Sequence, residues 1–307
     1  MKTFLAIMAL TFANTAHAEM SQVPPINTIT PSSGYSSSIR ICTGADGGAY
    51  FNKASQMMGL VQAKAKMPVS VEPGGGTYGC LTKMAKGEAE AAIIQMDAWV
   101  WAQKNAPDLY QLLVPSSHIL DEEMMAVCNR SWGGDELNDI AQNKGKTLTI
   151  AGGNTSGSLL TMNVLASFDV DFNLPNWRNA SSWEQALSEV KSGVSTCAFG
   201  VLSSDSPSWN TLNDEFGKDL RMVGFWDNDM KDLKFNSQRV YGWIAIPKDS
   251  DNLDRLLDWN KKGKLWSPEV GAVPAILVYR SDMISDTAGS ALANAGDQVA
   301  MVKDIHR

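Results

Sequence analysis

The chain has 307 residues, of which 26 are Lys or Arg and 33 are Asp or Glu, so its formal net charge at pH 7 is −7. This acidic balance argues against binding to the phosphate backbone of nucleic acids and against adhesion to anionic lipid. We therefore expect no nucleic-acid partner. At roughly 150 residues per domain, the length suits one large domain or two lobes.

The first residues predict export from the cytoplasm. Lys2 is followed by the short apolar run FLAIMALTF and by the small-residue pattern AHA that ends at Ala18, which is the order of a secretory signal peptide. The apolar run is far shorter than the ~20 residues that a membrane-spanning helix needs. We expect residues 1–18 to be removed by cleavage after Ala18, and the mature protein to be periplasmic. Because Glu19 rather than a cysteine follows, we expect no lipid anchor.

Residues 19–38 are predicted to form a flexible leader. This stretch, EMSQVPPINTITPSSGYSSS, contains eleven Ser, Thr or Pro residues and has no periodic apolar face. Such a composition is typical of an extended or disordered segment.

The order strand, glycine turn, helix then occurs three times along the chain. The first occurrence is SIRICTG followed by ADGGAYFNKASQMMGLVQAKAK, in which apolar residues recur at helical spacing. The second is MPVSVEP, GGGTYG and CLTKMAKGE, with Gly87 placed to end the helix. The third, TLTIAGGNTSGSLLTMNVLASF, has Thr155 or Ser156 as its predicted N-cap. A further helix, in SSWEQALSEVKSG, has Ser182 and Gln185 spaced as a capping box and Gly193 at its end.

This alternation predicts an α/β fold with mostly parallel sheets, in which the turns that lead from strands into helices lie on one edge. Ligands bind at that edge in open α/β sheets. Each glycine turn also exposes backbone N–H groups at a helix N-terminus, where the helix dipole favours an anion. If the first two turns belong to one lobe and the third to another, three helix N-termini converge on a cleft between the lobes.

Three stretches resemble the ordered motifs of the TAXI family, the extracytoplasmic solute receptors associated with TRAP transporters. They are TGADGGAYF (43–51), GGGTYGCLTKMAKGEAEAAIIQMD (74–97) and GGNTSGSLL (152–160). The chain departs from the family after the second turn, where Gly79 and Cys80 stand in place of an acidic residue and an asparagine. The resemblance implies a two-lobed type II periplasmic-binding-protein fold with a hinge and an interlobe cleft. We assign residues 39–125 and 235–307 to lobe 1, and residues 126–234 to lobe 2.

The resemblance also implies a function. The chain is expected to be a monomeric receptor that captures a small, usually carboxylated solute between its lobes, without a cofactor, and delivers it to membrane transporter subunits of the TRAP type. The stretch VYGWIAIPKDSDNLDRLLDWN (240–260) is similar to amino-acid receptors of ABC importers. A receptor for an ABC importer or a ligand-sensing module is therefore the alternative, and an enzyme on the same fold is the alternative of another class.

The candidate ligand-binding residues lie at the three motifs: Gly44, Gly48, Ala49, Tyr50, Gly76, Thr77, Gln95, Asp97, Thr155, Ser156, Gly157 and Ser158. Backbone N–H groups near Gly48, Thr77 and Ser156 to Ser158 would hold a carboxylate. Asp97 would accept a hydrogen bond from an ammonium group of the solute, or brace the end of its strand instead. Further candidates are Trp99 and Trp101 for stacking on an apolar part of the solute, and Arg130 and Arg178 for a charge-assisted clamp.

The residues for catalysis or metal binding are sparse. After Ala18 the only histidines are His118 and His306, no G-x-S-x-G motif presents a nucleophile, and no His, Cys or Asp cluster has ligand spacing. The acidic run DEE (121–123) is interpreted as a solvated charge run. We therefore expect neither an enzyme nor a metal site.

The four cysteines, Cys42, Cys80, Cys128 and Cys197, allow three disulfide pairings, and buried free thiols are the alternative. A bridge across the cleft would lock the hinge. We therefore predict the within-lobe pairs Cys42 with Cys80 and Cys128 with Cys197.

Overall fold

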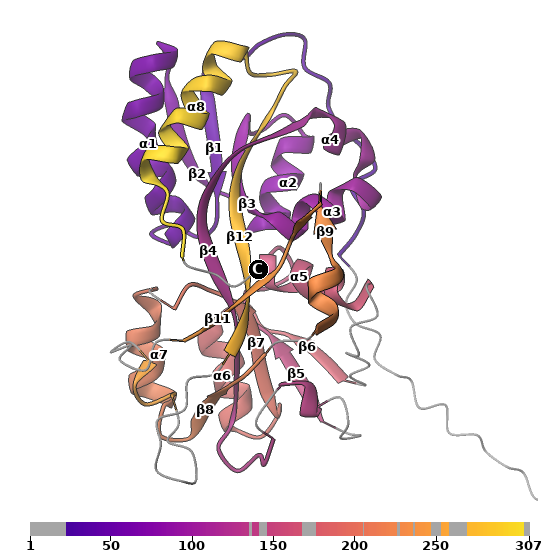
Figure 1. Cartoon of the computed structure of the whole chain (residues 1–307), viewed down its shortest axis with the longest axis vertical. Coiled ribbons are helices and arrows are strands. Elements are labelled where there is room, and N and C mark those ends of the chain that lie inside the picture. Colours follow the sequence, from indigo (N-terminus) through magenta and orange to yellow (C-terminus); the bar gives the residue numbers. More distant parts are fainter. Residues whose placement is uncertain are drawn as a thin grey trace, which may run out of the picture.

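The computed structural model describes residues 23–134, 137–140, 146–167, 176–204, 206–225, 228–235, 237–246, 253–257 and 269–303. The predicted signal peptide lies outside these ranges. Within them, no helix has both the length and the apolar content that crossing a membrane requires. The chain forms two lobes, one above the other in Figure 1, joined by strands that run through the centre of the molecule.

The first lobe is built on the parallel strands β1 (Ile39–Thr43), β2 (Val69–Pro73) and β3 (Ala91–Gln95), in the order β2-β1-β3. Helices α1 (Ala49–Ala65) and α8 (Asp286–Val299) pack together on one side of this sheet (Figure 1). On the other side lie α2 (Thr77–Ala85), α3 (Met96–Asn105) and α4 (Pro107–Leu112). The predicted helical spacing of the first helix is confirmed, because Tyr50, Ala54, Met57 and Val61 are buried.

The second lobe repeats this arrangement. Its strands β5 (Thr147–Ile150), β6 (Asn176–Asn179) and β7 (Cys197–Val201) are parallel, with β5 in the middle. Its helices are α5 (Gly157–Ser167), α6 (Trp183–Lys191) and α7 (Ser208–Phe216). Ser182 caps α6 as predicted, accepting a hydrogen bond from the backbone N–H of Gln185 at 3.2 Å.

Two long antiparallel strands join the lobes, β4 (Leu113–Asn129) and β12 (Glu269–Arg280). Between Leu113 and Glu122, β4 pairs with β12, and from Met124 onward it pairs with β7 and with β8 (Leu220–Val223). Strand β12 pairs in turn with β3 and with β11 (Gly242–Ala245). Because β4 pairs with strands of both lobes, it carries the chain directly from the sheet of the first lobe into that of the second.

The remaining elements are short: the 3₁₀ helices η1 (Leu137–Ile140) and η2 (Asn228–Asp232), and the hairpin of β9 (Lys234–Phe235) and β10 (Gln238–Arg239).

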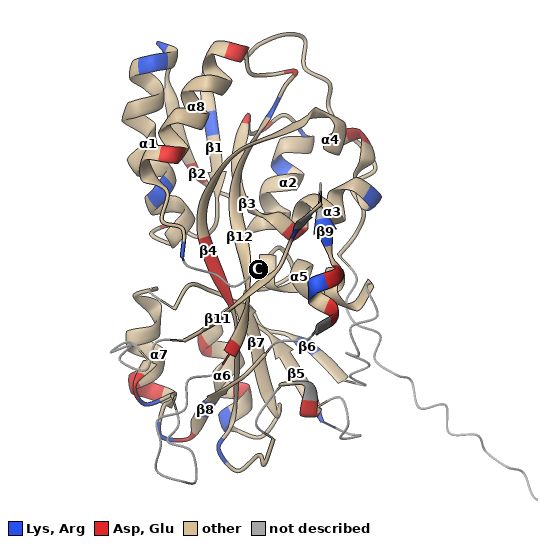
Figure 2. Cartoon of the chain, in the orientation of Figure 1, with Lys and Arg blue, Asp and Glu red and all other residues tan. Residues whose placement is uncertain are grey.

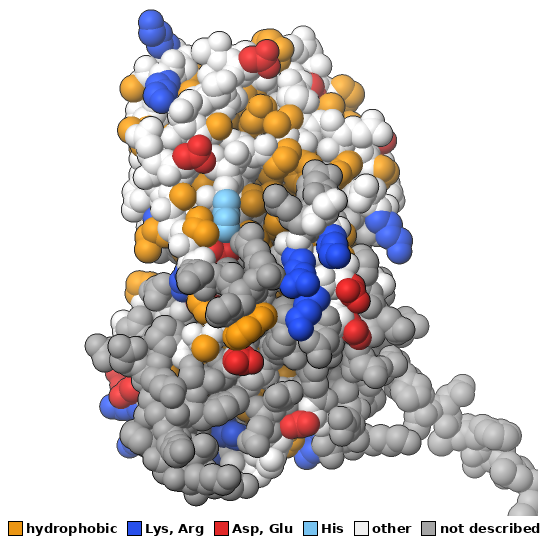
Figure 3. Space-filling model, viewed as in Figure 1, with side chains coloured by type: hydrophobic (Ala, Val, Ile, Leu, Met, Phe, Trp, Pro, Cys, Tyr) orange, Lys and Arg blue, Asp and Glu red, His pale blue; other side chains and the backbone are white. Residues whose placement is uncertain are grey.

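On the face shown in Figure 3, charged side chains of both signs are interspersed with apolar ones over the upper lobe.

The packing favours a larger second lobe than the sequence suggests. Ile246, Leu253, Leu256 and Val270 pack in the apolar cluster of α6 and α7, although the predicted boundary assigned residues 235–307 to the first lobe. This part of the chain returns to the first lobe only along β12, which starts beside β11 and ends beside β4 and β3. The lobe boundaries at residues 126 and 234 remain predictions.

Residues 23–38, from the predicted leader, contain no helix and run as extended chain over the first lobe before β1. Their backbone is bonded to it at several points: Ile26 N–H donates to Asn105 O at 2.8 Å, and Thr30 N–H to Ala85 O at 2.7 Å. The buried guanidinium of Arg280 donates to Thr30 O at 2.9 Å. This described part of the leader is therefore anchored to the first lobe.

The predicted disulfide pairing is confirmed. Cys42 of β1 is bonded to Cys80 of α2, with 5.5 Å between their Cα atoms, and Cys128 of β4 is bonded to Cys197 of β7, with 4.0 Å between theirs. Neither bridge crosses between the lobes, so neither fixes their relative orientation.

Candidate solute-binding cleft

The three glycine turns precede α1, α2 and α5, as the sequence predicts, and all three turns lie where the lobes meet. The first N–H groups of a helix have no intrahelical partner, so each turn leaves donors available at this level. The turns do not, however, converge on one cleft. They divide into two sides of the lobe junction.

On one side, which we call the packed side, the second and third turns touch each other and α3 lies against α5. Thr155 Oγ1 donates to Gly75 O at 2.7 Å, and Gly79 N–H donates to Thr155 O at 3.4 Å. A Cβ atom on Gly76 would lie 2.8 Å from Thr155 O. The space between these two turns is therefore filled by their own backbones.

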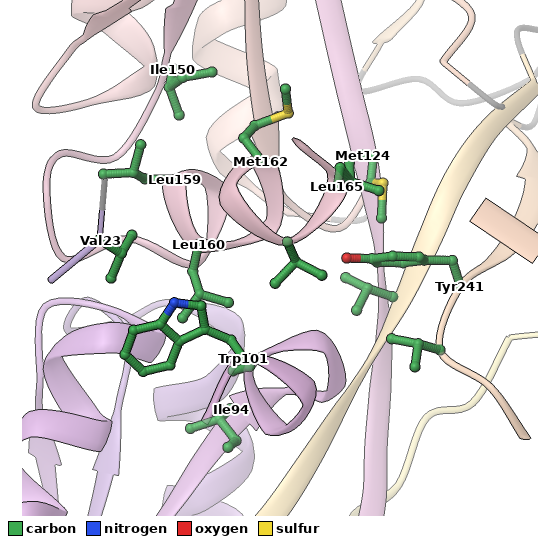
Figure 4. Close-up of a cluster of buried hydrophobic side chains, with 14 of the residues drawn as sticks. Val23, Ile94, Trp101, Met124, Ile150, Leu159, Leu160, Met162, Leu165 and Tyr241 are labelled. Carbon is green, nitrogen blue, oxygen red and sulfur yellow. The ribbon is translucent and has the colours of Figure 1, made fainter. Parts of the chain in front are cut away.

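An apolar cluster continues the packed side between α3 and α5 (Figure 4). Trp101 and Ile94 contribute from the first lobe, and Leu160 from the second, while Val23 of the anchored leader lies on the same cluster. Figure 4 also shows Met124, Ile150, Leu159, Met162, Leu165 and Tyr241. The apolar core is thus continuous from one lobe to the other on this side.

Asp97 is buried inside the packed side at the first turn of α3. Its Oδ2 accepts hydrogen bonds from Thr161 Oγ1 of α5 at 2.6 Å and from the Tyr241 hydroxyl at 2.9 Å. Burial raises the pKa of Asp97 from 3.8 to about 6, because its effect is larger than that of the two hydrogen bonds, which lower the pKa. Asp97 is therefore bonded to hydroxyls of α5 and of the residue before β11, and its role toward a solute stays a prediction.

The acidic run 121–123 is not solvated, and that interpretation was wrong. Asp121, Glu122 and Glu123 are all buried in β4, where Figure 2 shows a red segment close to the lobe junction. At this level β4 passes from one sheet to the other and is covered by the elements of both lobes. Each of the three buried carboxylates has its own set of hydrogen-bond donors.

Glu122 joins two of the predicted site residues. Its Oε2 accepts hydrogen bonds from the Tyr50 hydroxyl at 2.5 Å and from Gln95 Nε2 at 3.3 Å. Burial raises the pKa of Glu122 to about 7; the neighbouring carboxylates of Glu123 and Asp97 also raise it, while the two bonds lower it. Gln95 Oε1 has no hydrogen-bond partner among the described residues.

Glu123 and Asp121 bind the C-terminal segment. Glu123 Oε1 accepts from Lys303 Nζ at 2.7 Å, and its carboxylate also binds the N–H and hydroxyl of Ser204. Asp121 Oδ2 accepts from the backbone N–H of Lys303 at 3.0 Å, and its Oδ1 lies 3.0 Å from His118 Nε2. His118 is therefore paired with an acid on its own strand.

On the other side of the junction, which we call the cleft side, the first glycine turn faces the N-terminal end of α7 across a cleft of about 670 Å³. The lining comes from both lobes and from the C-terminal segment: Ala45, Asp46, Gly47, Gly48, Ala49, Asn52, Lys53, Gln56, Leu120, Asp121, Ser203, Ser206, Pro207, Ser208, Met301, Val302 and Lys303. A cleft of this size accommodates a small organic solute.

The N-termini of two helices border this cleft. Gly48, the N-cap of α1, and Pro207, the N-cap of α7, provide no side-chain hydrogen bond to their helices. The dipoles of both helices make the space between these two N-termini favourable for an anion. Lys53 also lines the cleft, and its Nζ donates to Val299 O at 2.8 Å.

The predicted site residues divide between the two sides. Gly48 and Ala49 line the cleft, whereas Gly44 and Tyr50 belong to the same turn and helix without lining it. The remaining candidates lie at the packed side or beside it: Gly76, Thr77, Gln95, Asp97, Thr155, Ser156, Gly157 and Ser158. Gln95 Oε1 packs directly on Gly157, where a Cβ atom would overlap it.

The second-lobe wall of the cleft is not among the residues predicted from the sequence. Ser203, Ser206 and Ser208 come from the segment between β7 and α7. A signal for this wall exists in the sequence, because SSDSPSW places serines and a proline immediately before a helix, the pattern of a helix N-terminus. Residues 301–303 also line the cleft, and no comparable pattern in the nearby sequence predicts this.

The further candidates lie away from the cleft lining. Trp99 and Trp101 are buried on the packed side, where they pack edge-on against Tyr110 and Tyr78. Arg130 donates to the backbone oxygen of Gly217 in the second lobe, and Arg178 is paired with Glu189 on the surface. Within the described residues, no group of His, Cys, Asp or Glu is arranged to hold a metal ion.

No protein-family model and no curated protein matches the sequence. Solved structures are similar in fold. An amino acid ABC transporter substrate-binding protein, AbpA from Streptococcus pneumoniae bound to L-arginine, has a TM-score of 0.51 at 10% identity, over 86% of this chain and 89% of that one. A Xanthomonas citri protein bound to a chloride ion also has a TM-score of 0.51, at 12% identity over 85% of this chain and 83% of that one. The predicted two-lobed periplasmic-binding-protein fold is confirmed.

Proposed function

We propose that this protein is an extracytoplasmic receptor that captures a small carboxylated solute between its two lobes. The observation that carries the proposal is the cleft of about 670 Å³, whose walls come from both lobes. A ligand held by both lobes stabilises the arrangement in which they are close, which is how a two-lobed receptor couples binding to its shape. The fold shared with a substrate-binding protein supports the same function.

The carboxylate is assigned to the space between the N-termini of α1 and α7, which lie on opposite walls of the cleft. The Gly48 N–H already donates to Ala45 O at 3.1 Å, so the N–H of Ala49 would donate to the carboxylate from the first lobe, and that of Ser208 from the second. Leu120, Met301 and Val302 offer an apolar wall for the rest of the solute. The packed-side candidates, including Thr77 and Ser156, would then support the lobes rather than touch the solute.

Delivery to a TRAP-type membrane transporter is part of the proposal, as the resemblance to TAXI receptors implies. Delivery to an ABC importer is the alternative, supported by the fold of AbpA. In both cases the protein acts in the periplasm and releases its solute chemically unchanged. Export rests on the signal-peptide pattern that ends at Ala18.

The test begins with native mass spectrometry of the purified chain, to detect and identify a retained solute. A thermal-shift screen of carboxylates and amino acids follows. At a hundredfold excess over Kd, a true ligand should add about 2.7 kcal/mol to the free energy of unfolding. The recovered solute should be unchanged, and a chemically converted one would favour the enzyme alternative.

Two variants at Gly48 test the carboxylate position. Gly48 has φ −71° and ψ 171°, which Asp and Asn adopt readily, but a Cβ atom there would lie 3.0 Å from the backbone oxygen of Ala45, so both variants strain this turn equally. Gly48→Asp places a negative charge at the proposed carboxylate site and should weaken binding of the best carboxylate from the screen by roughly tenfold. Gly48→Asn has nearly the same shape and the same Cβ contact without the charge, so it should bind the carboxylate roughly tenfold more tightly than Gly48→Asp does. Equal affinities in the two variants would move the carboxylate elsewhere.

A further inference from the structure

The chain leaves α8 and returns to the lobe junction as a short extended segment, Met301 to Lys303. Met301 forms a parallel bridge with Leu120, and its N–H donates to Ile119 O at 2.8 Å. Lys303 N–H donates to the carboxylate of Asp121 at 3.0 Å. The segment therefore continues along β4 toward the point where that strand enters the second lobe.

Lys303 then reaches the second lobe with its side chain. Its ammonium group lies 2.7 Å from Glu123 Oε1, 3.3 Å from Ser203 Oγ and 3.1 Å from Ser204 Oγ. The Glu123 carboxylate is 1% exposed, and a carboxylate buried this deeply needs a bound cation or several donors. Lys303 supplies that cation from a segment that begins on the first lobe.

We propose that Met301 to Lys303 is a latch that holds the cleft side of the two lobes closed, with Asp121 and Glu123 as its binding points. One end of the latch is fixed through α8, which packs on α1. The other end is fixed at Glu123 and at the serines before α7. Widening the cleft moves α1 away from α7 and therefore strains the contact between Lys303 and the serines.

The latch also forms part of the cleft wall, because all three of its residues line the cleft. Met301 and Val302 are 60% and 55% exposed, so their side chains are held at the cleft by the backbone and by Lys303 rather than by burial. Such a segment can detach without disrupting an apolar core. The latch acts on the positions of the lobes and is independent of the proposed solute.

The experiment compares three full-length variants without added ligand. Lys303→Met removes the charge and keeps the aliphatic length, Lys303→Arg keeps the charge, and Lys64→Met removes an exposed charge on α1, away from the latch. Hydrogen exchange is followed in residues 45–56 and 203–216, on the two walls of the cleft, and in α5 on the packed side. Small-angle scattering reports the radius of gyration.

Lys303→Met should speed exchange on both cleft walls by roughly tenfold, the effect of losing a charge-assisted hydrogen bond, and should enlarge the radius of gyration. Exchange in α5 should stay unchanged, as should all three measurements in the two control variants. Deleting residues 301–307 should have the same effect as Lys303→Met or a larger one.

Two results would overturn the latch. One is unchanged exchange and scattering in both Lys303→Met and the deletion. The other is faster exchange in α5 in parallel with the cleft walls, because that pattern indicates a general loss of stability. Neither result would bear on solute binding, which the thermal-shift screen measures separately.

Discussion

The packed side and the cleft side of the lobe junction hold the same two lobes together by different physical means. On the packed side, α3 and α5 share an apolar core that contains Trp101 and Leu160. On the cleft side, the contact consists of a few polar groups around a cleft, with Lys303 and Glu123 among them. Separating apolar surfaces exposes all of their buried area to water, whereas polar groups regain hydrogen bonds from water when they part.

From this difference we predict which side of the junction moves. The packed side is expected to stay together and serve as the pivot, while the cleft side opens about β4 and β12.

The largest effect is expected from a cavity in the packed side. Leu160 is fully buried, so Leu160→Ala should lower the free energy of unfolding by about 2–5 kcal/mol, measured by urea denaturation. Because the core is continuous between the lobes, hydrogen exchange should accelerate in both α3 and α5.

Leu187→Ala is the matched control. Leu187 is equally buried, but in the cluster that α6 and α7 form inside the second lobe. Leu187→Ala should lower the free energy of unfolding by a similar amount, while hydrogen exchange in α3 changes little. If the two variants gave the same exchange pattern, the packed side would be no more than a part of the second-lobe core.

The second prediction concerns the buried carboxylate of Glu122, beside the pivot. Its pKa of about 7 lies above the ordinary value of 4.5, so between these pH values the folded protein binds the proton more tightly than the unfolded chain does. The stabilisation of the folded state that comes from protonated Glu122 is therefore complete below about pH 4.5 and is lost as pH rises through about 7. Asp97, with a pKa raised to about 6, acts in the same direction at slightly lower pH.

Glu122→Gln removes this charge and should leave the protein about 1–3 kcal/mol more stable than the wild type at pH 8, with a smaller difference at pH 5. Urea denaturation across this pH range measures both. Glu184→Gln, on the exposed face of α6, should leave the pH dependence of the free energy of unfolding unchanged. A Glu122→Gln variant less stable than the wild type at pH 8 would show that the carboxylate is bound in its charged form.

The sequence predicts the local parts of this architecture well. Glycines before α1, α2 and α5, the cap at Ser182 and the left-handed Gly193 after α6 are all encoded within a few residues of where they act. The disulfide pairs were also predictable, because each pair lies within one lobe. These features depend on neighbours in the chain or on a simple constraint from the hinge.

The junction itself could not be predicted, because its contacts join residues far apart in the chain. Nothing near Thr155 indicates that it meets Gly75, eighty positions earlier. Three consecutive acids look solvated until β4 is known to belong to both sheets, which buries both of its faces. The latch depends on where α8 ends relative to β4, and no local pattern near Lys303 contains that information.

The smallest effect is expected from the polar contact on the packed side. Thr155→Ala removes the 2.7 Å hydrogen bond to Gly75 O at an exposed position and should cost about 0.5–1.5 kcal/mol of unfolding free energy. Thr82→Ala is the control, because Thr82 Oγ1 binds Tyr78 O within one helix. If the apolar contact between α3 and α5 is the pivot, Thr155→Ala should leave the radius of gyration of the ligand-free protein unchanged, in contrast to Lys303→Met. An enlarged radius in Thr155→Ala but not in Thr82→Ala would mean that the meeting of the second and third turns, rather than the apolar core behind them, holds this side together.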